Sequence, residues 1–246
     1  MKQSSLSPFA LIGFVLAILV ALAAILAGFG SRWGWWNFRI GFIILRWAVY
    51  GGIIAAVISL IGTILTWPGV LHRNFLLSIF GLVIGILVFG APWCYWRTAQ
   101  KVPPIHDITT DLENPPRFVS ILPLRKNAPN PAEYGGPKIA EKQLEAYPDL
   151  APAIFSLPAD KVFGRALMTA QKMGWKIVDT NPAEGRIEAT DTTFFFGFKD
   201  DIVIRVAPAD HGSRVDIRSV SRVGRSDVGT NAKRIRKFLK ELKETR

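Results

Sequence analysis

The first hundred residues most constrain how this chain folds, because they contain no acidic side chain and three long apolar runs. The first run covers residues 9–29, about 21 positions where roughly 20 are enough to cross the hydrocarbon core of a bilayer. The other two runs, 47–67 and 75–96, are of similar length and end in tryptophan, which is enriched at membrane interfaces. A cleaved signal peptide has a shorter apolar core. The sequence therefore predicts an α-helical membrane anchor of three spans over residues 1–100.

Arginines recur every seven residues between the first two runs, at Arg32, Arg39 and Arg46. Seven residues make two helical turns, so a helix here would carry the three arginines on one face. This spacing predicts a helix in the lipid headgroup layer or a wet amino-terminal extension of the second span. An ordinary loop is the alternative, because glycines in the same stretch weaken a helix.

All 19 acidic residues lie after position 100, where they are interspersed with 24 of the 30 lysines and arginines. A surface that binds nucleic acid is usually a clustered basic face, so we expect no nucleic-acid partner. The single cysteine, Cys94, excludes a disulfide framework, a cysteine-based zinc site and a paired redox thiol.

Prolines recur through residues 101–158 and forbid long helices and strands there. Two short apolar islands, 118–124 and 151–157, interrupt this proline-rich stretch. We therefore expect a linker that is laid over a folded body.

Residues 159–246 carry the periodicities of a compact α+β domain. Helical spacing covers 160–174 and 231–244. Strand-like alternation covers four runs: 175–179, 186–190, 202–206 and 214–219. These runs predict an antiparallel meander of about four strands, with the two helices on one face and water on the other.

Catalytic motifs are missing from the sequence, which has no G-x-S-x-G elbow, phosphate-binding loop, dinucleotide fingerprint or H-E-x-x-H pair. The only candidate metal cluster is His106, Asp107, Asp111 and Glu113, and these residues lack a recognised ligand spacing. We expect a solvated turn there, and no metal, cofactor or catalytic residue.

The most unusual polar stretch is SVSRVGRSDVGTN, residues 219–231, which joins the last predicted strand to the last helix. Backbone N–H groups and the positive end of a helix can converge on an anion in such a turn. This interpretation predicts an anion-binding pocket formed by Arg222, Arg225, Ser226, Asp227, Thr230 and Asn231. In the alternative, Asp227 or Thr230 caps the helix and Arg222 pairs with Asp200 or Asp201.

Four phenylalanines, Phe194, Phe195, Phe196 and Phe198, stand next to a predicted strand. Core packing is their expected role. The alternative is a surface that enters the bilayer or grips an acyl chain.

Three segments, 186–190, 197–206 and 213–227, resemble the domain-of-unknown-function family 1499 (DUF1499), and the resemblance extends from about Pro103 to the end. Many members have an early proline segment that contains a cysteine, which residues 115–119 replace here. Members without a multispan anchor resemble secreted or lipid-anchored bacterial proteins. The resemblance therefore implies a multi-pass protein of the bacterial inner membrane whose carboxyl-terminal domain is periplasmic.

The charge count points to the opposite orientation. Five lysines and arginines stand near the span ends on the side of the carboxyl-terminal domain, against Lys2 and Arg73 on the other side. The positive-inside rule would place the domain in the cytoplasm. We give the resemblance more weight, because Arg39 and Arg46 have a second explanation as residues of an amphipathic helix.

These observations favour a noncatalytic, membrane-tethered envelope module that binds an anionic membrane lipid or a membrane or envelope protein partner. One alternative is an enzyme that acts on a lipid or cell-wall substrate. Another is a structural subunit of a membrane complex.

Overall fold

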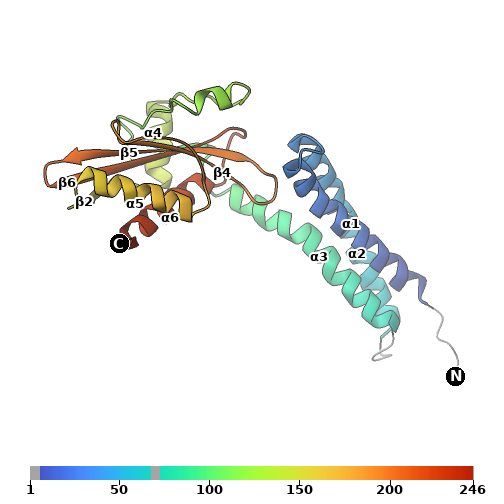
Figure 1. Ribbon diagram of the computed structural model, residues 1–246. Coiled ribbons are helices and arrows are strands. Elements are labelled where there is room, and N and C mark those ends of the chain that lie inside the picture. Colours follow the sequence, from blue (N-terminus) through green and yellow to red (C-terminus); the bar gives the residue numbers. More distant parts are fainter. Residues whose placement is uncertain (1–5, 68–72, 246) are drawn as a thin grey trace. The chain divides into compact units, whose positions relative to one another are not determined.

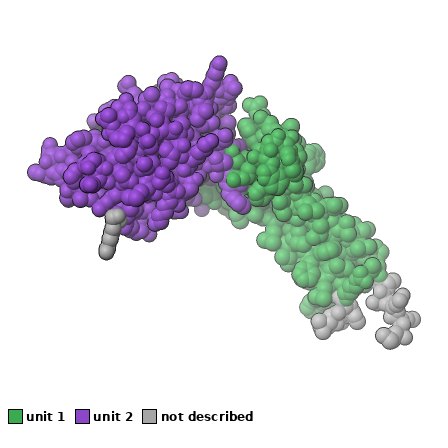
Figure 2. All heavy atoms as spheres, viewed as in Figure 1, with its two compact units in different colours: residues 1–98, 195–197 green, residues 99–194, 198–246 purple. Residues whose placement is uncertain are grey.

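The computed structural model describes residues 6–67 and 73–245, which divide into two compact units (Figure 2). Unit 1 comprises residues 1–98 and 195–197, and unit 2 comprises residues 99–194 and 198–246. Lys2 of the charge count lies outside the described residues.

Unit 1 contains three helices, α1 (Pro8–Arg32), α2 (Phe38–Leu65) and α3 (Arg73–Ala99). All three are long and apolar enough to cross a membrane, with mean hydropathies of 3.1, 2.2 and 2.4. They confirm the three predicted apolar helices, by length and composition.

The arginine-rich stretch between the first two spans is divided between two helices. Arg32 ends α1, whereas Arg39 and Arg46 lie in the amino-terminal part of α2. The predicted helix with all three arginines on one face is therefore wrong, because residues 33–37 are not helical, and only Arg39 and Arg46 lie in an extension of the second span.

Small buried residues bring the helices of unit 1 close together. A Cβ atom added at Gly85 of α3 would lie 2.8 Å from the backbone nitrogen of Ala56 and 2.8 Å from the carbonyl oxygen of Gly52, both on α2. In a bilayer, leucine side chains gain little by leaving the lipid hydrocarbon for another helix. Close packing between small residues is therefore a main cause of helix association there.

Unit 2 is built on one antiparallel sheet. Its elements follow in chain order as β1 (Asp107–Thr109), η1 (Leu122–Arg125), α4 (Pro137–Ala146), β2 (Ala153–Phe155), α5 (Ala159–Lys172), β3 (Lys176–Asn181), β4 (Arg186–Thr192), β5 (Lys199–Ala209), β6 (Gly212–Ser221) and α6 (Thr230–Glu244). The strand order is β1-β6-β5-β4-β3, and β2 pairs with the first half of β6.

The two predicted helices and four predicted strands are confirmed as α5, α6 and β3 to β6. The strand number is wrong, because the sheet has six strands. Both additional strands come from the proline-rich stretch, are three residues long and pair with β6. The same stretch also contains the 10-residue helix α4.

One face of the sheet carries the main hydrophobic core and is covered by α5 and α6 (Figure 1). Fully buried isoleucines of β4, β5 and β6 pack there against Ile235 and Phe238 of α6. The Phe238 ring stacks on that of Trp175, with 5.4 Å between their centroids. Both helices cover the same face of the sheet, as predicted.

The opposite face is not wet, and that prediction is wrong. Residues before α4, including η1, lie over it, and their Phe118 and Ile121 pack on Val203 and Val220 of the sheet. Asp201, Asp216 and Arg218 on this face are buried, and they form ion pairs with arginine or aspartate side chains.

The prediction that the four phenylalanines enter the core is also wrong. Phe194 is 76% exposed. Phe195 and Phe196 belong to unit 1, where the Phe195 ring lies edge-on to Phe29 at 5.6 Å and the Phe196 ring lies 4.7 Å from Phe42.

Candidate functional site

The predicted anion pocket lies in the turn between β6 and α6. Its first residue, Arg222, forms a two-point ion pair with Asp201, with Nε and Nη2 each 2.8 Å from a carboxylate oxygen. Asp201 is fully buried and also accepts hydrogen bonds from Arg125 Nη1 at 2.6 Å and the Thr190 hydroxyl at 2.7 Å. The Arg222 guanidinium therefore faces a carboxylate inside the protein, as the alternative describes.

Asp227 occupies the backbone donors that an external anion would use. Its carboxylate accepts the N–H groups of Gly229 and Asn231 at 2.8 and 2.7 Å, and Ser226 Oγ accepts that of Val228 at 3.2 Å. Burial raises the pKa of the Asp227 carboxyl, against the lowering effect of the two N–H groups. The chain thus provides its own acidic group at the amino end of α6.

Asn231 is fully buried at the centre of a side-chain network. Its Nδ2 donates to the His106 carbonyl and to Ser221 Oγ, both at 3.0 Å. Its Oδ1 accepts from Ser219 Oγ at 2.7 Å and from Arg234. The Asn231 side chain is therefore engaged inside the protein.

Arg225 differs from these residues because it is exposed, and it has no hydrogen bond or ion pair in the part of the chain that the structure describes. Thr230 is partly exposed. The structure brings all six predicted residues into one turn, but the polar groups of Arg222, Ser226, Asp227 and Asn231 have internal partners. Anion binding by the turn stays a prediction.

The turn between β6 and α6 is hydrogen-bonded to the residues that follow α3. Ser226 Oγ donates to the Pro103 carbonyl at 3.3 Å, and the Asp227 N–H donates to the Ile105 carbonyl at 3.1 Å. Pro103 is only four positions after Ala99, the last residue of α3. The amino end of α6 is therefore tied to the chain just after its third apolar helix.

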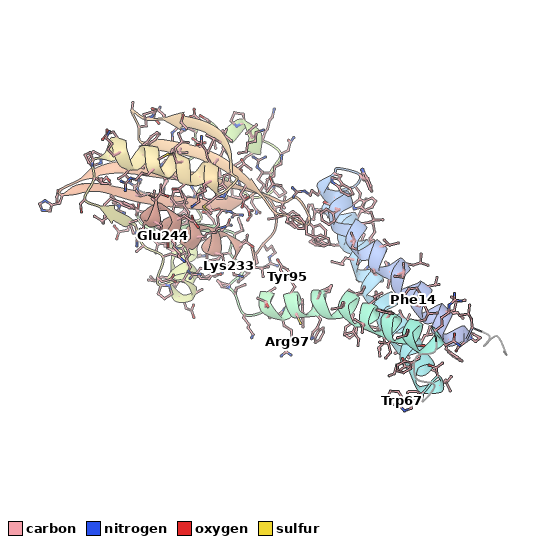
Figure 3. The ribbon with its side chains drawn as sticks, turned by 60° about the horizontal axis from the view of Figure 1, so that its bottom comes forward. Phe14, Trp67, Tyr95, Arg97, Lys233 and Glu244 are labelled. Atoms are coloured by element: carbon pink, nitrogen blue, oxygen red, sulfur yellow. The ribbon has the colours of Figure 1, made fainter. Side chains whose placement is uncertain are left out.

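The outer face of α6 carries a basic stripe, which we define as Lys233, Lys237 and Lys240. These lysines stand at i, i+4 and i+7, share one face, and are exposed. Figure 3 labels Lys233 and Glu244, near the two ends of the helix. The adjacent Arg236 is paired with Asp149 at 2.6 Å, so its charge is compensated.

A second polar cluster, which sequence motifs did not reveal, is buried under η1. Glu188 is fully buried, and its carboxylate accepts the N–H groups of Val119, Ser120 and Ile121 at 2.8, 3.1 and 2.8 Å. Arg186 donates to the same carboxylate. The signal in the sequence was the spacing of Arg186 and Glu188, because residues two positions apart on a strand share one face of the sheet.

The prediction of a solvated turn at His106 to Glu113 is wrong for Asp107 and Asp111, whereas Glu113 is exposed. Asp107 is buried and receives Arg218 Nη2 at 2.7 Å, and Asp111 receives both Arg205 and Arg214 at 2.9 Å. Among the described residues, no group of three or more His, Cys, Asp and Glu is arranged to hold a metal ion. Guanidinium groups hold both of these carboxylates.

The family model described as "Protein of unknown function (DUF1499)" matches residues 107–242, which is more than half of the chain. No curated protein matches the chain.

Proposed function

Because this chain belongs to the DUF1499 family, whose description assigns no activity, we propose its function from its own residues: it is a membrane-anchored, noncatalytic module that binds anionic lipid headgroups. The observation that carries this proposal is the exposed basic stripe of α6, on a helix whose amino end is hydrogen-bonded to the residues just after α3.

Chain length limits how far this helix can lie from a membrane that α3 crosses. Four residues span at most about 14 Å, so Pro103 lies within that distance of the last residue of α3. Anionic lipids attract each nearby lysine by about 1 kcal/mol, and the attraction decays within a Debye length of about 8 Å. A stripe of three exposed lysines suits a surface of phosphate headgroups.

We expect lipid charge to protect the basic stripe from a water-soluble acetylating reagent. In nanodiscs that contain the full chain, Lys237 and Lys240 should react about fivefold more slowly with phosphatidylglycerol than with phosphatidylcholine, and about 1 M salt should abolish the difference. Lys138 and Lys142 of α4 are also exposed and are the internal control.

Lipid retention by substituted variants also tests whether the basic stripe binds anionic headgroups. The double substitution Lys237→Gln and Lys240→Gln should reduce copurified anionic lipid, measured by mass spectrometry, whereas Lys138→Gln with Lys142→Gln should not. Equal acetylation of both lysine pairs in both nanodiscs would refute headgroup binding by α6. Turnover of a bound lipid would instead indicate an enzyme, and a stoichiometric protein partner would indicate a structural subunit.

We also propose that unit 2 faces the periplasm of a bacterial cell, on the basis of the family resemblance. With Cys94 replaced by alanine, a cysteine placed at the exposed His211 in the β5–β6 turn should react with a membrane-impermeant maleimide in intact spheroplasts. The nearby Ser213 is fully buried and would not report topology. Reaction of His211→Cys only after lysis would place the domain in the cytoplasm.

A further inference from the structure

A hollow of about 240 Å³ lies in unit 2, between the proline-rich segment before η1 and the strands β4 and β5. Its wall includes the side chains of Arg117, Arg186 and Arg205 and one acidic residue, Glu184. Three guanidinium groups therefore surround one small hollow.

The charges of two of these wall residues compensate each other. Arg186 Nε donates to Glu184 at 2.9 Å, and Arg186 Nη1 also donates to Asp179 at 3.0 Å and to Glu188. Glu184 therefore adds no uncompensated negative charge to the hollow.

The other two arginines keep donors that have no partner in the described part of the chain. Arg205 uses only Nη2, which donates to Asp111 and Asp216 at 2.9 Å each, and its side chain is 26% exposed. Arg117 is exposed and makes no hydrogen bond or ion pair there. Arginine donors of this kind bind a carboxylate or phosphate with charge-assisted hydrogen bonds.

Accessible apolar residues also line the hollow, together with Asn114. Val119 is 52% exposed and Pro115 is partly exposed, whereas Val203 and Pro116, which also line it, are buried. Ligand pockets of this type combine apolar walls with a few convergent polar groups, and sites for drug-sized ligands usually have volumes of about 300–1,000 Å³. A hollow below that range suits a smaller molecule.

From this arrangement we propose a second binding site, for a small organic anion with a carboxylate head and an apolar body. Arg117 and Arg205 hold the carboxylate, and Val119 and Pro115 contact the apolar body. This site is independent of the lipid surface proposed for α6, because Val203 lies on the sheet face opposite to the one that α6 covers.

Benzoate is a suitable probe, with benzamide as its neutral analogue and inorganic phosphate as an anion that has no apolar body. At matched ionic strength, about 10 mM benzoate should slow amide hydrogen exchange of the full chain in residues 114–119 and 199–206. Benzamide and phosphate should slow it much less, because one lacks the charge and the other the apolar contact. Arg117→Gln should weaken benzoate binding by about tenfold.

Lys126→Gln is the matched control, because it removes another exposed cationic side chain that is outside the hollow, and it should leave benzoate binding unchanged. Exchange without ligand verifies that both variants fold. Equal protection by benzoate and phosphate, protection by benzamide, no protection at all, or an Arg117→Gln variant that binds normally would each overturn the proposal. None of these outcomes affects acetylation of the basic stripe.

Discussion

Replacing Asp201 by asparagine is expected to destabilise unit 2 by about 3–5 kcal/mol, the usual cost of breaking a buried ion pair from one side. Asp201 receives hydrogen bonds from Arg125 and Arg222, whose side chains are 3% and 15% exposed. Asparagine preserves the shape but leaves both guanidinium groups without their common anion. Charge, rather than lost packing, is therefore the cause of the expected effect.

Hydrogen exchange of the full chain in detergent micelles measures this loss, because slowly exchanging amides of β5 report the opening of unit 2 separately from the anchor. Asp149→Asn is the matched control. Asp149 also pairs with an arginine, Arg236, but the two side chains are 55% and 40% exposed, and an exposed pair contributes at most about 1 kcal/mol. Similar losses in both variants would contradict a special role for the buried pair.

The lowered pKa of the Asp201 carboxyl leads us to expect a loss of stability in acid. Burial raises its pKa, but the hydrogen bonds from Arg222 and Thr190 and the charge of Arg222 together lower the pKa by a larger amount. The pKa therefore lies below its ordinary value of about 4. A carboxyl whose pKa is lower in the folded state contributes stability above its unfolded pKa and loses that contribution as the pH falls through the folded value. Below about pH 4, the parent chain should lose more stability than Asp201→Asn.

The elements that could be predicted from sequence are those with a strong local pattern. The apolar spans, α5, α6 and the four longer strands show their periodicity within one segment, so neighbouring residues suffice to identify them. The strands at Asp107–Thr109 and Ala153–Phe155 have three residues each, too few to show an alternation. Pairing with β6, more than fifty residues away in the sequence, defines both strands.

The wrong prediction of a wet sheet face has a related cause. Alternation along β6 reveals that Arg214, Asp216 and Arg218 share a face, but it does not reveal what covers that face. Their partners include Asp107 and Asp111, about a hundred residues earlier, in a segment without a pattern. Polar residues that pair across such a distance resemble solvated residues when the sequence is examined locally.

The turn before α6 was recognised as polar, yet the partner of Arg222 could not be chosen between Asp200 and Asp201. Adjacent residues of a strand point to opposite faces of the sheet. Asp200 pairs with Arg234 of α6 on the core face, whereas Asp201 pairs with Arg222 on the face under η1. The choice depends on which face α6 covers, and that is a property of the assembled sheet.

Replacing Glu188 by glutamine is expected to cost about 3 kcal/mol or more, because this carboxylate accepts three backbone N–H groups and also pairs with Arg186. Glutamine has one oxygen acceptor, and its NH₂ group would point donors at donors. The three N–H groups belong to residues that lead into η1. Loss of the carboxylate should therefore loosen the cover over this sheet face before it affects the core under α5 and α6.

Amide hydrogen-exchange rates should show that the segment before η1 loosens before the core under α5 and α6. In Glu188→Gln, the amides of Val119, Ser120 and Ile121 should exchange much faster, and the amides of α5 should change only as far as global stability falls. Glu184→Gln is the matched control, because Glu184 also pairs with Arg186 but its side chain is 57% exposed, so it should change stability by less than about 1 kcal/mol. If both variants left the amides before η1 protected, the carboxylate of Glu188 would not be what holds this segment on the sheet.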